Sequence, residues 1–260
     1  VAQRGDGSVE RISVHGHLAS KVPGLARLQR GIHHHRQNYR AAIIHQDEIN
    51  DFLARYGHLQ NEQFIEAGLK HFNITYNVFG RENIPDSGRN IFVSNHPLGG
   101  LDGLVFINEL SRYFGDIKFP VNDILMNIRN LSGIFVPINK HGAQGREAAR
   151  MIEEAYASGS QILYFPAGLC SRKKKGNIKD LEWHKSFISK AIQHKRDIVP
   201  AYFSGRNSGF FYNLSNIRNF FGVKANIEML YLAEEMFKQK EKVINLVFGK
   251  KISWQQFDSS

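Results

Sequence analysis

The sequence predicts an α/β protein with a central mixed, mainly parallel sheet flanked by helices and preceded by an amphipathic helical pair. Two observations predict this class. Eight short runs rich in Ile, Val, Phe and Tyr follow one another after residue 73, and most are separated by stretches with helical periodicity. At 260 residues, the chain is also long enough to bury one sizeable core.

Residues 1–44 differ from the rest of the chain. They carry seven Lys and Arg residues against only Asp6 and Glu10, and their apolar periodicity is weak. We expect a basic, loosely ordered N-terminal arm. Its histidine triplet, residues 33–35, is not expected to bind metal, because adjacent side chains point in different directions and no further ligand group follows at a useful spacing.

The remaining residues, 45–260, are expected to form one domain. Residues 45–72 contain two segments whose apolar residues recur at helical spacing, which predicts the helical pair. The α/β core over residues 73–260 follows. Its strands are predicted at ITYNVFG, NIFVSN, IKFPV, GIFVPI, QILYFP, DIVPAYF, NIEMLYL and INLVFG, and its helices near residues 103–114, 144–158 and 183–194.

Composition limits the partners and the cellular compartment that we expect for the chain. The formal charge of +10 favours anionic partners such as phosphates, acidic lipids or nucleic acid. The single cysteine, Cys170, excludes an internal disulfide framework and fits a reducing compartment. The chain has no apolar run of about 18 residues and does not start with an apolar secretory segment. We therefore expect a cytoplasmic location, with any membrane contact peripheral.

The segment SNHPLGGLDG, residues 94–103, is the first candidate site. His96 follows a predicted strand, and Gly99 and Gly100 permit a tight turn before a helix that should begin near Asp102. In one interpretation Asp102 folds back onto the imidazole and orients His96 as a general base. No nucleophilic serine or cysteine motif accompanies the pair, which assigns the nucleophile to the substrate. The alternatives are a buried histidine at a strand end and an aspartate that caps the helix.

Two basic segments also follow predicted strands. FPAGLCSRKKKG, residues 165–176, leads from a Pro-Gly turn into four consecutive cations that can present charge to an anion. A solvated basic loop is the alternative for this run. Lys140 ends the strand GIFVPI on the same expected edge of the sheet. Ligands of open α/β sheets bind at the carboxyl ends of strands, so position favours a function for both segments.

Four motifs, in sequence order, resemble those of the glycerolipid acyltransferase superfamily, lysophosphatidate acyltransferase type, over residues 70–205. NHPLGGLD resembles the family's histidine-aspartate block. GIFVPINK, FPAGLCSR and IVPAYF resemble its second, third and fourth blocks. The resemblance implies the glycerolipid acyltransferase fold and an O-acyltransferase.

The chain departs from the family pattern at three places. His96 and Asp102 have five residues between them where the family usually has four, and Ala167 stands in place of a glutamate. Cys170 stands where the family usually has the arginine credited with gripping the acceptor phosphate, and Arg172 lies two positions later. NHPLGGLDG with FPAG resembles a bacterial branch that acylates lyso-aminolipids, such as lyso-ornithine or lyso-glycine lipids, in membrane lipid synthesis. Both a lyso-aminolipid and 1-acyl-glycerol-3-phosphate stay open as acceptors.

The resemblance also implies a mechanism. His96 would deprotonate the hydroxyl of the lyso-lipid, with Asp102 orienting it, and the hydroxyl would attack a thioester of acyl carrier protein or coenzyme A. Backbone N–H groups near Gly99 and Gly100, or over residues 166–168, are candidates to stabilise the oxyanion. No metal or tightly bound cofactor is implied. The residues expected to contact substrate are Asn95, Gly99, Gly100, Lys140, Pro166, Gly168, Ser171, Arg172 and Lys173.

A membrane lipid surface, on the inner face of the cell membrane, is a further expected partner. SGRNSGFFYNLSNIRNFFGVK places Phe210, Leu214, Ile217 and Phe221 at helical spacing near basic residues, as in helices that lie at a bilayer interface. A core helix is the alternative. The helical pair and the basic arm are further candidates for membrane contact.

Two other functions are compatible with these residues. A non-catalytic basic module would bind anionic lipid or nucleic acid through residues 1–40 and 172–175. No nucleic acid partner is expected, because the basic clusters are not interleaved with aromatic residues and no zinc, helix-turn-helix or ribonucleoprotein signature is present. A hydrolase would use the His96–Asp102 pair to activate water, and the family resemblance favours acyl transfer over hydrolysis.

Overall fold

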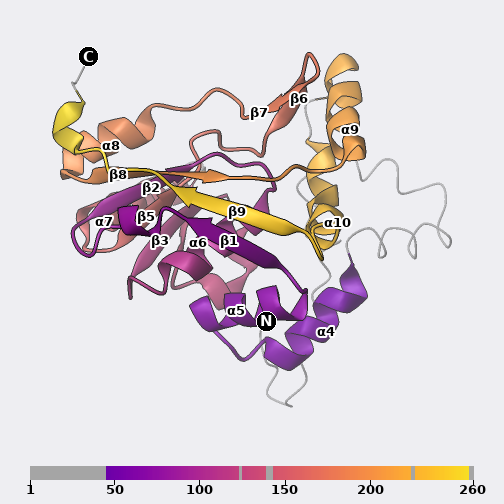
Figure 1. Cartoon of the computed structure of the whole chain (residues 1–260), viewed down its shortest axis with the longest axis horizontal. Helices are drawn as coiled ribbons and strands as arrows, with labels where there is room; N and C mark the ends of the chain where they lie inside the picture. Colours follow the sequence, from indigo (N-terminus) through magenta and orange to yellow (C-terminus); the bar gives the residue numbers. More distant parts are fainter. Residues whose placement is uncertain (1–44, 123–124, 139–142, 224–225, 258–260) are drawn as a thin grey trace.

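The computed structural model describes residues 45–122, 125–138, 143–223 and 226–257. The arm expected over residues 1–44 and the candidate Lys140 therefore lie outside the described residues. Within the described part of the chain, helices cover both faces of one central sheet (Figure 1). The predicted α/β class, with a mixed and mainly parallel sheet, is confirmed.

The central sheet, as far as the chain is described, has seven strands in the order β1-β9-β8-β2-β5-β3-β4. Neighbouring strands run parallel, except that β8 and β9 are antiparallel. The middle strand, β2, is buried along its whole length, as expected for a strand covered on both faces. The strands are β1 Thr75–Phe79, β2 Asn90–Ser94, β3 Ile117–Val121, β4 Phe135–Pro137, β5 Gln161–Tyr164, β8 Asp197–Phe203 and β9 Val243–Phe248.

The predicted helical pair is confirmed. α4 spans Gln46–Tyr56 and α5 spans Asn61–His71. The apolar side chains of Phe52, Phe64 and Ile65 are buried in the main core. α5 packs against α6, which follows the candidate His–Asp turn, so the pair covers one face of the sheet.

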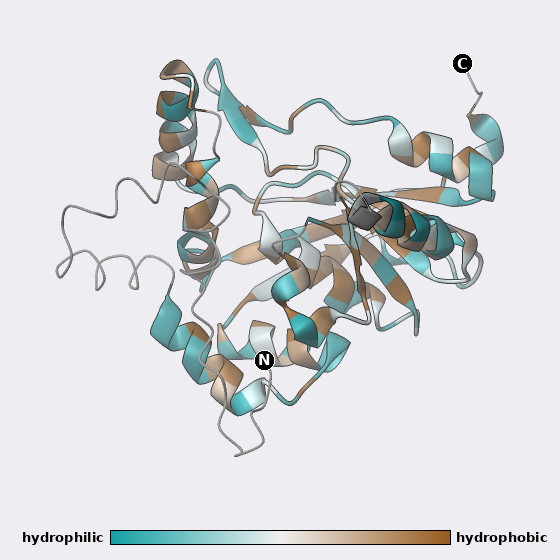
Figure 2. Cartoon of the chain, turned by 180° about the vertical axis from the view of Figure 1, so that it is seen from behind, coloured by the Kyte–Doolittle hydropathy of each residue, from teal (hydrophilic) through white to brown (hydrophobic). Residues whose placement is uncertain are grey.

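The three predicted helices of the core are also present. They are α6 Gly100–Leu110, α7 Ala143–Ala157 and α8 Ser186–His194. Alternate residues of β2 point to opposite faces: Phe92 packs in the cluster that contains α6 residues, whereas Ile91 and Val93 pack in the cluster that contains α7 and α8 residues. Figure 2 shows hydrophobic residues concentrated in the strands between these helices.

Arg196 fixes the turn between α7 and β5. Its guanidinium is fully buried and donates hydrogen bonds to the carbonyls of Ala155, Tyr156, Ser158 and Ser160 at 2.6–3.2 Å. Carbonyls at a helix C-terminus lack partners within the helix and favour a nearby cation. Arg196 therefore stabilises the end of α7 from the residue just before β8.

The strand predicted at NIEMLYL is wrong. These residues form the 3₁₀ helix η4, Ile227–Tyr231, followed by α10, Leu232–Phe237. The alternation of apolar residues resembled a strand, but tertiary contacts decide the conformation: Glu228 is buried in ion pairs with Arg172 and Arg218. Met229 and Leu232 pack against a small cluster around Cys170.

A hairpin beside the sheet was not predicted. β6, Arg172–Lys174, pairs antiparallel with β7, Asn177–Lys179, around the two-residue turn of Lys175 and Gly176. Both turn residues have positive φ, 48° and 83°, as in the type I′ turns that favour glycine. α9, Gly209–Phe220, packs against the hairpin.

Four short 3₁₀ helices complete the described elements: η1 Arg81–Asn83, η2 Leu125–Asn127, η3 Arg129–Leu131 and η5 Trp254–Gln256. Among the residues that the structure describes, no helix combines the length and apolar character needed to cross a bilayer.

Candidate active site

The candidate residues meet at the carboxyl ends of β2 and β5. These two strands are parallel neighbours in the middle of the sheet. His96 lies two residues after β2, and Phe165 directly follows β5. Because parallel neighbours end at the same edge, the two loops that leave them come together where open α/β sheets usually bind ligands.

Asp102 folds back onto His96, as the first interpretation predicted. Nδ1 of His96 lies 3.1 Å from Oδ2 of Asp102, and the same oxygen accepts the backbone N–H of Leu98 at 2.8 Å. Asp102 sits in the first turn of α6, but its partners precede the helix, so it closes the turn as well as orienting the ring.

Gly99 makes this turn possible. Its φ of 78° and ψ of −135° lie in a region that residues with a Cβ rarely adopt. A Cβ at this position would also lie 2.9 Å from Cδ2 of Leu232. Gly100 is different: it is exposed, and a Cβ there would meet no atom within 4 Å. The first residue of α6 therefore borders open space.

The carboxyl group of Asp102 is fully buried. Burial raises the pKa of Asp102 above its usual value, and the hydrogen bonds from His96 and the Leu98 amide act in the opposite direction. A buried carboxylate favours a positive charge on the imidazole that it contacts. Asp102 is therefore placed to stabilise the imidazolium form of His96.

The imidazole of His96 is held by stacking as well. It lies against the ring of Phe165, with centroids 4.2 Å apart and planes 15° apart. The side chain of His96 is 16% exposed. Nδ1 is used by Asp102, and Nε2 makes no hydrogen bond to any described residue. Nε2 is thus the ring nitrogen left to exchange a proton with a substrate.

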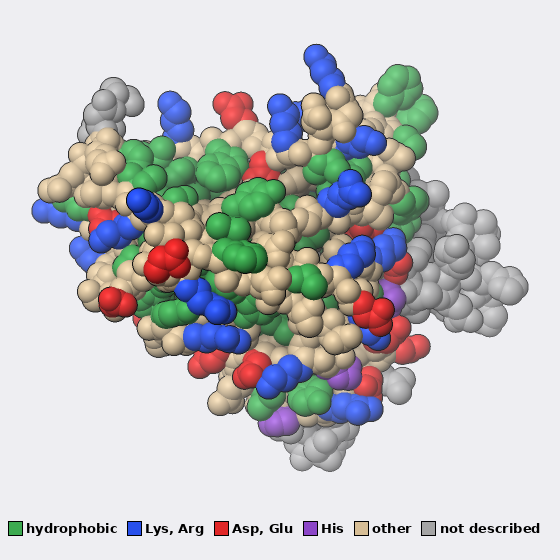
Figure 3. All heavy atoms as spheres, viewed as in Figure 1, with side chains coloured by type: hydrophobic (Ala, Val, Ile, Leu, Met, Phe, Trp, Pro, Cys, Tyr) green, Lys and Arg blue, Asp and Glu red, His purple; other side chains and the backbone are tan. Residues whose placement is uncertain are grey.

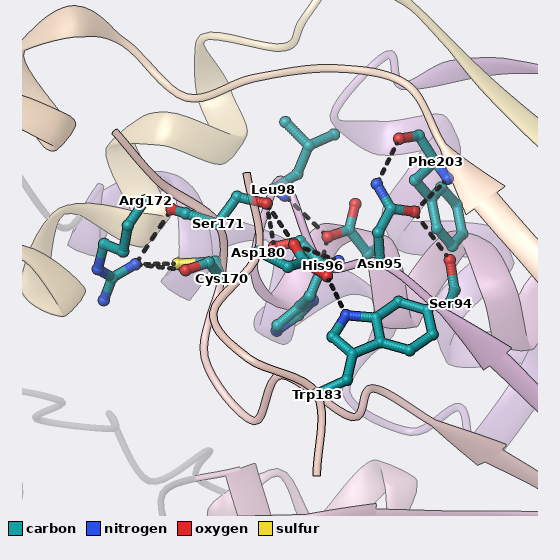
Figure 4. A network of polar contacts seen from close by, with 11 residues as sticks. Ser94, Asn95, His96, Leu98, Cys170, Ser171, Arg172, Asp180, Trp183 and Phe203 are labelled. Atoms are coloured by element: carbon teal, nitrogen blue, oxygen red, sulfur yellow. Dashed lines mark hydrogen bonds and ion pairs between the residues drawn. The ribbon is translucent and has the colours of Figure 1, made fainter. Parts of the chain in front are cut away.

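Asp180 anchors the backbone of the loop that carries His96 and was missed by sequence reasoning. Its carboxylate accepts the N–H of His96 at 3.2 Å, the hydroxyl of Ser171 at 2.5 Å and the indole N–H of Trp183 at 3.0 Å (Figure 4). The dipeptide Lys175-Gly176 is the sequence signal that could have indicated Asp180, because it favours a hairpin turn. In that hairpin Lys179 pairs with Arg172, so the next residue, Asp180, returns to Ser171 at the start of β6.

The described residues contain no group of three or more His, Cys, Asp or Glu side chains able to hold a metal ion. His96, Asp102 and Asp180 lie near one another, but Asp180 faces the backbone N–H of His96.

Two predicted substrate contacts make structural hydrogen bonds. Asn95 accepts the N–H of Phe203 at 2.7 Å and donates to its carbonyl at 2.9 Å, which ties the ends of β2 and β8 together. Ser171 donates its N–H to the carbonyl of His96 at 2.8 Å, in addition to its bond with Asp180. Both residues lie beside His96 and hold its loop (Figure 4).

The turn after β5 contributes Pro166 and Gly168. The carbonyl of Pro166 accepts the N–H of His184, and the N–H of Gly168 donates to the carbonyl of Phe165 at 3.0 Å. Gly168 has a positive φ of 67°. Pro166 has no N–H and that of Gly168 is engaged, so in this turn only Ala167 retains an N–H without a bond to a described residue.

Arg172 points away from His96 (Figure 4). Its buried guanidinium lies 3.0 Å from Glu228 and donates to the carbonyl of Cys170 at 2.6 Å. Burial raises the pKa of the Cys170 thiol, whose sulfur also accepts from Arg172. Lys173, the next residue of β6, is partly exposed. The charge of Arg172 is therefore compensated inside the protein.

The chain is similar in sequence to a protein family and to known relatives. A family model described as "Acyltransferase" matches residues 16–259. Lyso-glycine lipid O-acyltransferases of Bacteroides thetaiotaomicron and Phocaeicola vulgatus are 50% and 47% identical to the chain over 224 residues, which is 86% of this chain and 82% and 80% of theirs. The crystal structure of the 1-acyl-sn-glycerophosphate acyltransferase of Thermotoga maritima aligns with a TM-score of 0.47 at 16% identity, covering 94% of this chain and 85% of that one. The chain belongs to the acyltransferase family.

Proposed function

We propose that this enzyme is an O-acyltransferase that moves a fatty acyl group from a thioester to the hydroxyl of a lyso-glycine lipid. The observation that carries the choice of acceptor is the 50% identity, over 86% of the chain, to a lyso-glycine lipid O-acyltransferase. The resemblance of NHPLGGLDG to the branch that acylates lyso-aminolipids agrees with it. The working location that follows is the cytoplasmic face of the cell membrane, where such acceptors would reside.

His96 acts as the general base in this proposal. Nε2 takes the proton of the acceptor hydroxyl as the oxygen attacks the thioester carbonyl. The tetrahedral intermediate then collapses, the C–S bond breaks, and the proton passes from the imidazolium to the leaving thiolate. Asp102, at 3.1 Å from Nδ1, holds the ring and stabilises its positive charge in between. The stacking of His96 on Phe165 supports a fixed ring plane during both proton transfers.

The oxyanion is stabilised at the start of α6. The first N–H groups of a helix have no partner within it and carry partial positive charge. The N–H of Asp102 bonds to the carbonyl of Gly99, so those of Gly100 and Leu101 are the candidates. Open space at Gly100 supports the approach of a carbonyl there. The turn over residues 166–168 is less suitable, because Ala167 alone retains an N–H there without a bond to a described residue.

The ion pair between Arg172 and Glu228 supports the choice of an acceptor without a phosphate. A guanidinium bound to Glu228 at 3.0 Å is a poor partner for a phosphate, because binding the phosphate would leave a buried carboxylate uncompensated. A phosphate on the acceptor is therefore not needed to balance Arg172. Lys173, the next residue of β6, is partly exposed and contacts the headgroup or the donor in this proposal.

The test is an acyl transfer assay with purified enzyme. Acyl carrier protein and coenzyme A thioesters with a labelled acyl group are each offered to lyso-glycine lipid, lyso-ornithine lipid and lysophosphatidate. We expect product from lyso-glycine lipid, with one thioester preferred as donor. Product from lysophosphatidate alone would contradict the proposed acceptor, and free fatty acid without any acylated lipid would mean that water replaces the hydroxyl.

A further inference from the structure

We propose that the end of α9 and the β6–β7 hairpin together form a docking surface for an anionic bilayer. We define the apolar tip as Ile217, Phe220, Phe221 and Val223, and the basic hairpin as residues 172–179. The inference deepens the proposed function, since an enzyme that acylates membrane lipids must reach them at the bilayer.

The apolar tip is exposed to an unusual degree. Phe220 is 85% exposed, Phe221 is 72% exposed and Ile217 is 55% exposed. Large apolar side chains that gather on one exposed patch usually mark a binding surface, whereas single ones do not. The aromatic pair is typical of side chains that enter the headgroup region of a bilayer.

The opposite face of α9 is fixed to the protein. Phe211 and Tyr212 are buried around Cys170, and Arg218 is in an ion pair with Glu228 at 2.9 Å. Glu228 also binds Arg172, the first residue of β6. The buried Arg172–Glu228–Arg218 group therefore connects α9 to the hairpin, so the apolar tip is presented by an anchored helix.

The basic hairpin supplies charge beside the apolar tip. Lys174 and Lys175 are exposed, and the type I′ turn at Lys175 and Gly176 projects from the protein. In Figure 3, hydrophobic side chains gather at the far end of α9, and Lys and Arg side chains lie next to them over the hairpin. Cations around an apolar patch favour a surface of anionic lipid over a neutral one.

The helical pair does not offer such a surface. Its apolar residues Phe52, Phe64, Ile65 and Leu69 are buried in the main core. Among the described residues, none of the large exposed hydrophobic side chains belongs to α4 or α5, whereas four belong to the apolar tip. The second membrane candidate from the sequence thus has its apolar face occupied.

The docking surface is close to the catalytic loop. β6 begins directly after Ser171, whose N–H bonds to the carbonyl of His96. Three residues of strand span about 10 Å, so the turn of the hairpin lies roughly one strand length from that loop. A lipid that leaves the bilayer at the hairpin would have a short path to Nε2.

The experiment is co-sedimentation with vesicles. The 260-residue chain is mixed with vesicles of phosphatidylcholine alone or of equal parts phosphatidylcholine and phosphatidylglycerol. We expect the parent to prefer the anionic vesicles. The double variant Phe220→Ser/Phe221→Ser should bind both kinds at least about tenfold more weakly, because two aromatic side chains no longer enter the bilayer. Lys174→Gln should reduce binding to anionic vesicles only.

Two controls separate this inference from the proposed function. Phe79→Ser changes a 53% exposed phenylalanine on β1 and should bind vesicles as the parent does. Transfer to a lyso-lipid dissolved in detergent should be equal for the parent and the Phe220→Ser/Phe221→Ser variant, since neither residue touches the site.

Unchanged vesicle binding by the Phe220→Ser/Phe221→Ser variant would overturn the docking surface while leaving the acyltransferase proposal intact. Sedimentation velocity supplies a second check. If the parent is a dimer and the double variant a monomer with unchanged vesicle binding, the apolar tip joins two copies of the chain, and the bilayer assignment is wrong.

Discussion

His96 is positioned through its ring and its backbone together. Asp102 and Phe165 hold the imidazole, and Asp180 accepts the backbone N–H. The spacing of His96, two glycines and Asp102 predicted the first of these contacts, because a glycine turn can bring residues six positions apart together. Asp180 is 84 residues from His96, and only the Lys175-Gly176 turn, which returns the chain to Ser171 beside His96, could have indicated this contact.

The charge of Asp102 can be removed with little change of shape. In Asp102→Asn, Oδ1 can keep the bonds from Leu98 and His96, and Nδ2 takes the place of a carboxylate oxygen that has no hydrogen-bond partner among the described residues. We expect kcat to fall roughly 10²- to 10⁴-fold, because the imidazolium loses its counter-charge. Steady-state transfer assays measure this.

The same substitution predicts a pH effect on stability. The pKa of Asp102 is raised in the folded protein by burial, so its contribution to stability is complete below the unfolded pKa and is lost as pH rises through the folded value. Asp102→Asn does not ionise. Its free energy of unfolding relative to the parent should therefore increase between acid and neutral pH in urea titrations, and a decrease would contradict the assigned cause.

Asp180 should affect the reaction rate by holding His96. Asp180→Leu removes three accepted hydrogen bonds, whereas Asp180→Asn can keep those from His96 and Trp183 and turn its amide toward the Ser171 hydroxyl. We expect kcat to fall about 10²-fold in the leucine variant and clearly less in the asparagine variant, since small displacements of a catalytic group are costly. Asp86→Leu, at an exposed loop aspartate, is the control and should leave kcat unchanged.

Among the secondary structure elements, the sequence predicted the helices and strands whose apolar residues recur with a regular period. The helical pair and the strands of the central sheet follow from apolar spacing, since each buries a regular face. The hairpin β6–β7 was missed because its strands are three residues each and carry mostly polar side chains. Residues 226–232 were predicted as a strand because their apolar residues alternate along the sequence, whereas the ion pairs of Glu228 with distant arginines cannot be read from it.

The C-terminal end of α7 is stabilised by Arg196, a residue distant in the sequence. Arg196→Met would leave four carbonyls around the end of α7 without their donor. Burial lowers the pKa of Arg196 to about 10, which leaves it charged at neutral pH. We expect the free energy of unfolding to drop by about 3 kcal/mol or more.

Arg89→Met is the matched control, measured by the same urea unfolding. Arg89 is exposed and donates to the carbonyls of Ala157 and His194, near the same helix ends. Exposed bonds of this kind contribute about 1 kcal/mol or less. Equal losses in the two variants would mean that burial of Arg196 does not set its contribution.

In the whole molecule, the helices cover the two faces of the sheet, and the candidate site lies at an edge of the sheet. The helical pair and α6 cover one face of the sheet, α7 and α8 cover the other, and the candidate site lies at the edge where β2 and β5 end. The order of motifs in the sequence predicted which loops meet at this edge, because parallel strands bring their carboxyl ends together. It did not predict that Arg172 turns inward, since Glu228 is 56 residues away.

His96 is proposed as the general base of acyl transfer to a lyso-lipid. The most direct measurement is the transfer rate of His96→Ala with an acyl thioester and lyso-glycine lipid, beside circular dichroism and thermal unfolding of the same preparation. His58→Ala, at an exposed histidine between α4 and α5, is the control. We expect a folded His96→Ala protein whose rate is lower by roughly 10²- to 10⁴-fold, with the His58→Ala rate unchanged. A folded His96→Ala protein that transfers acyl groups at the parent rate would mean that His96 is not the general base.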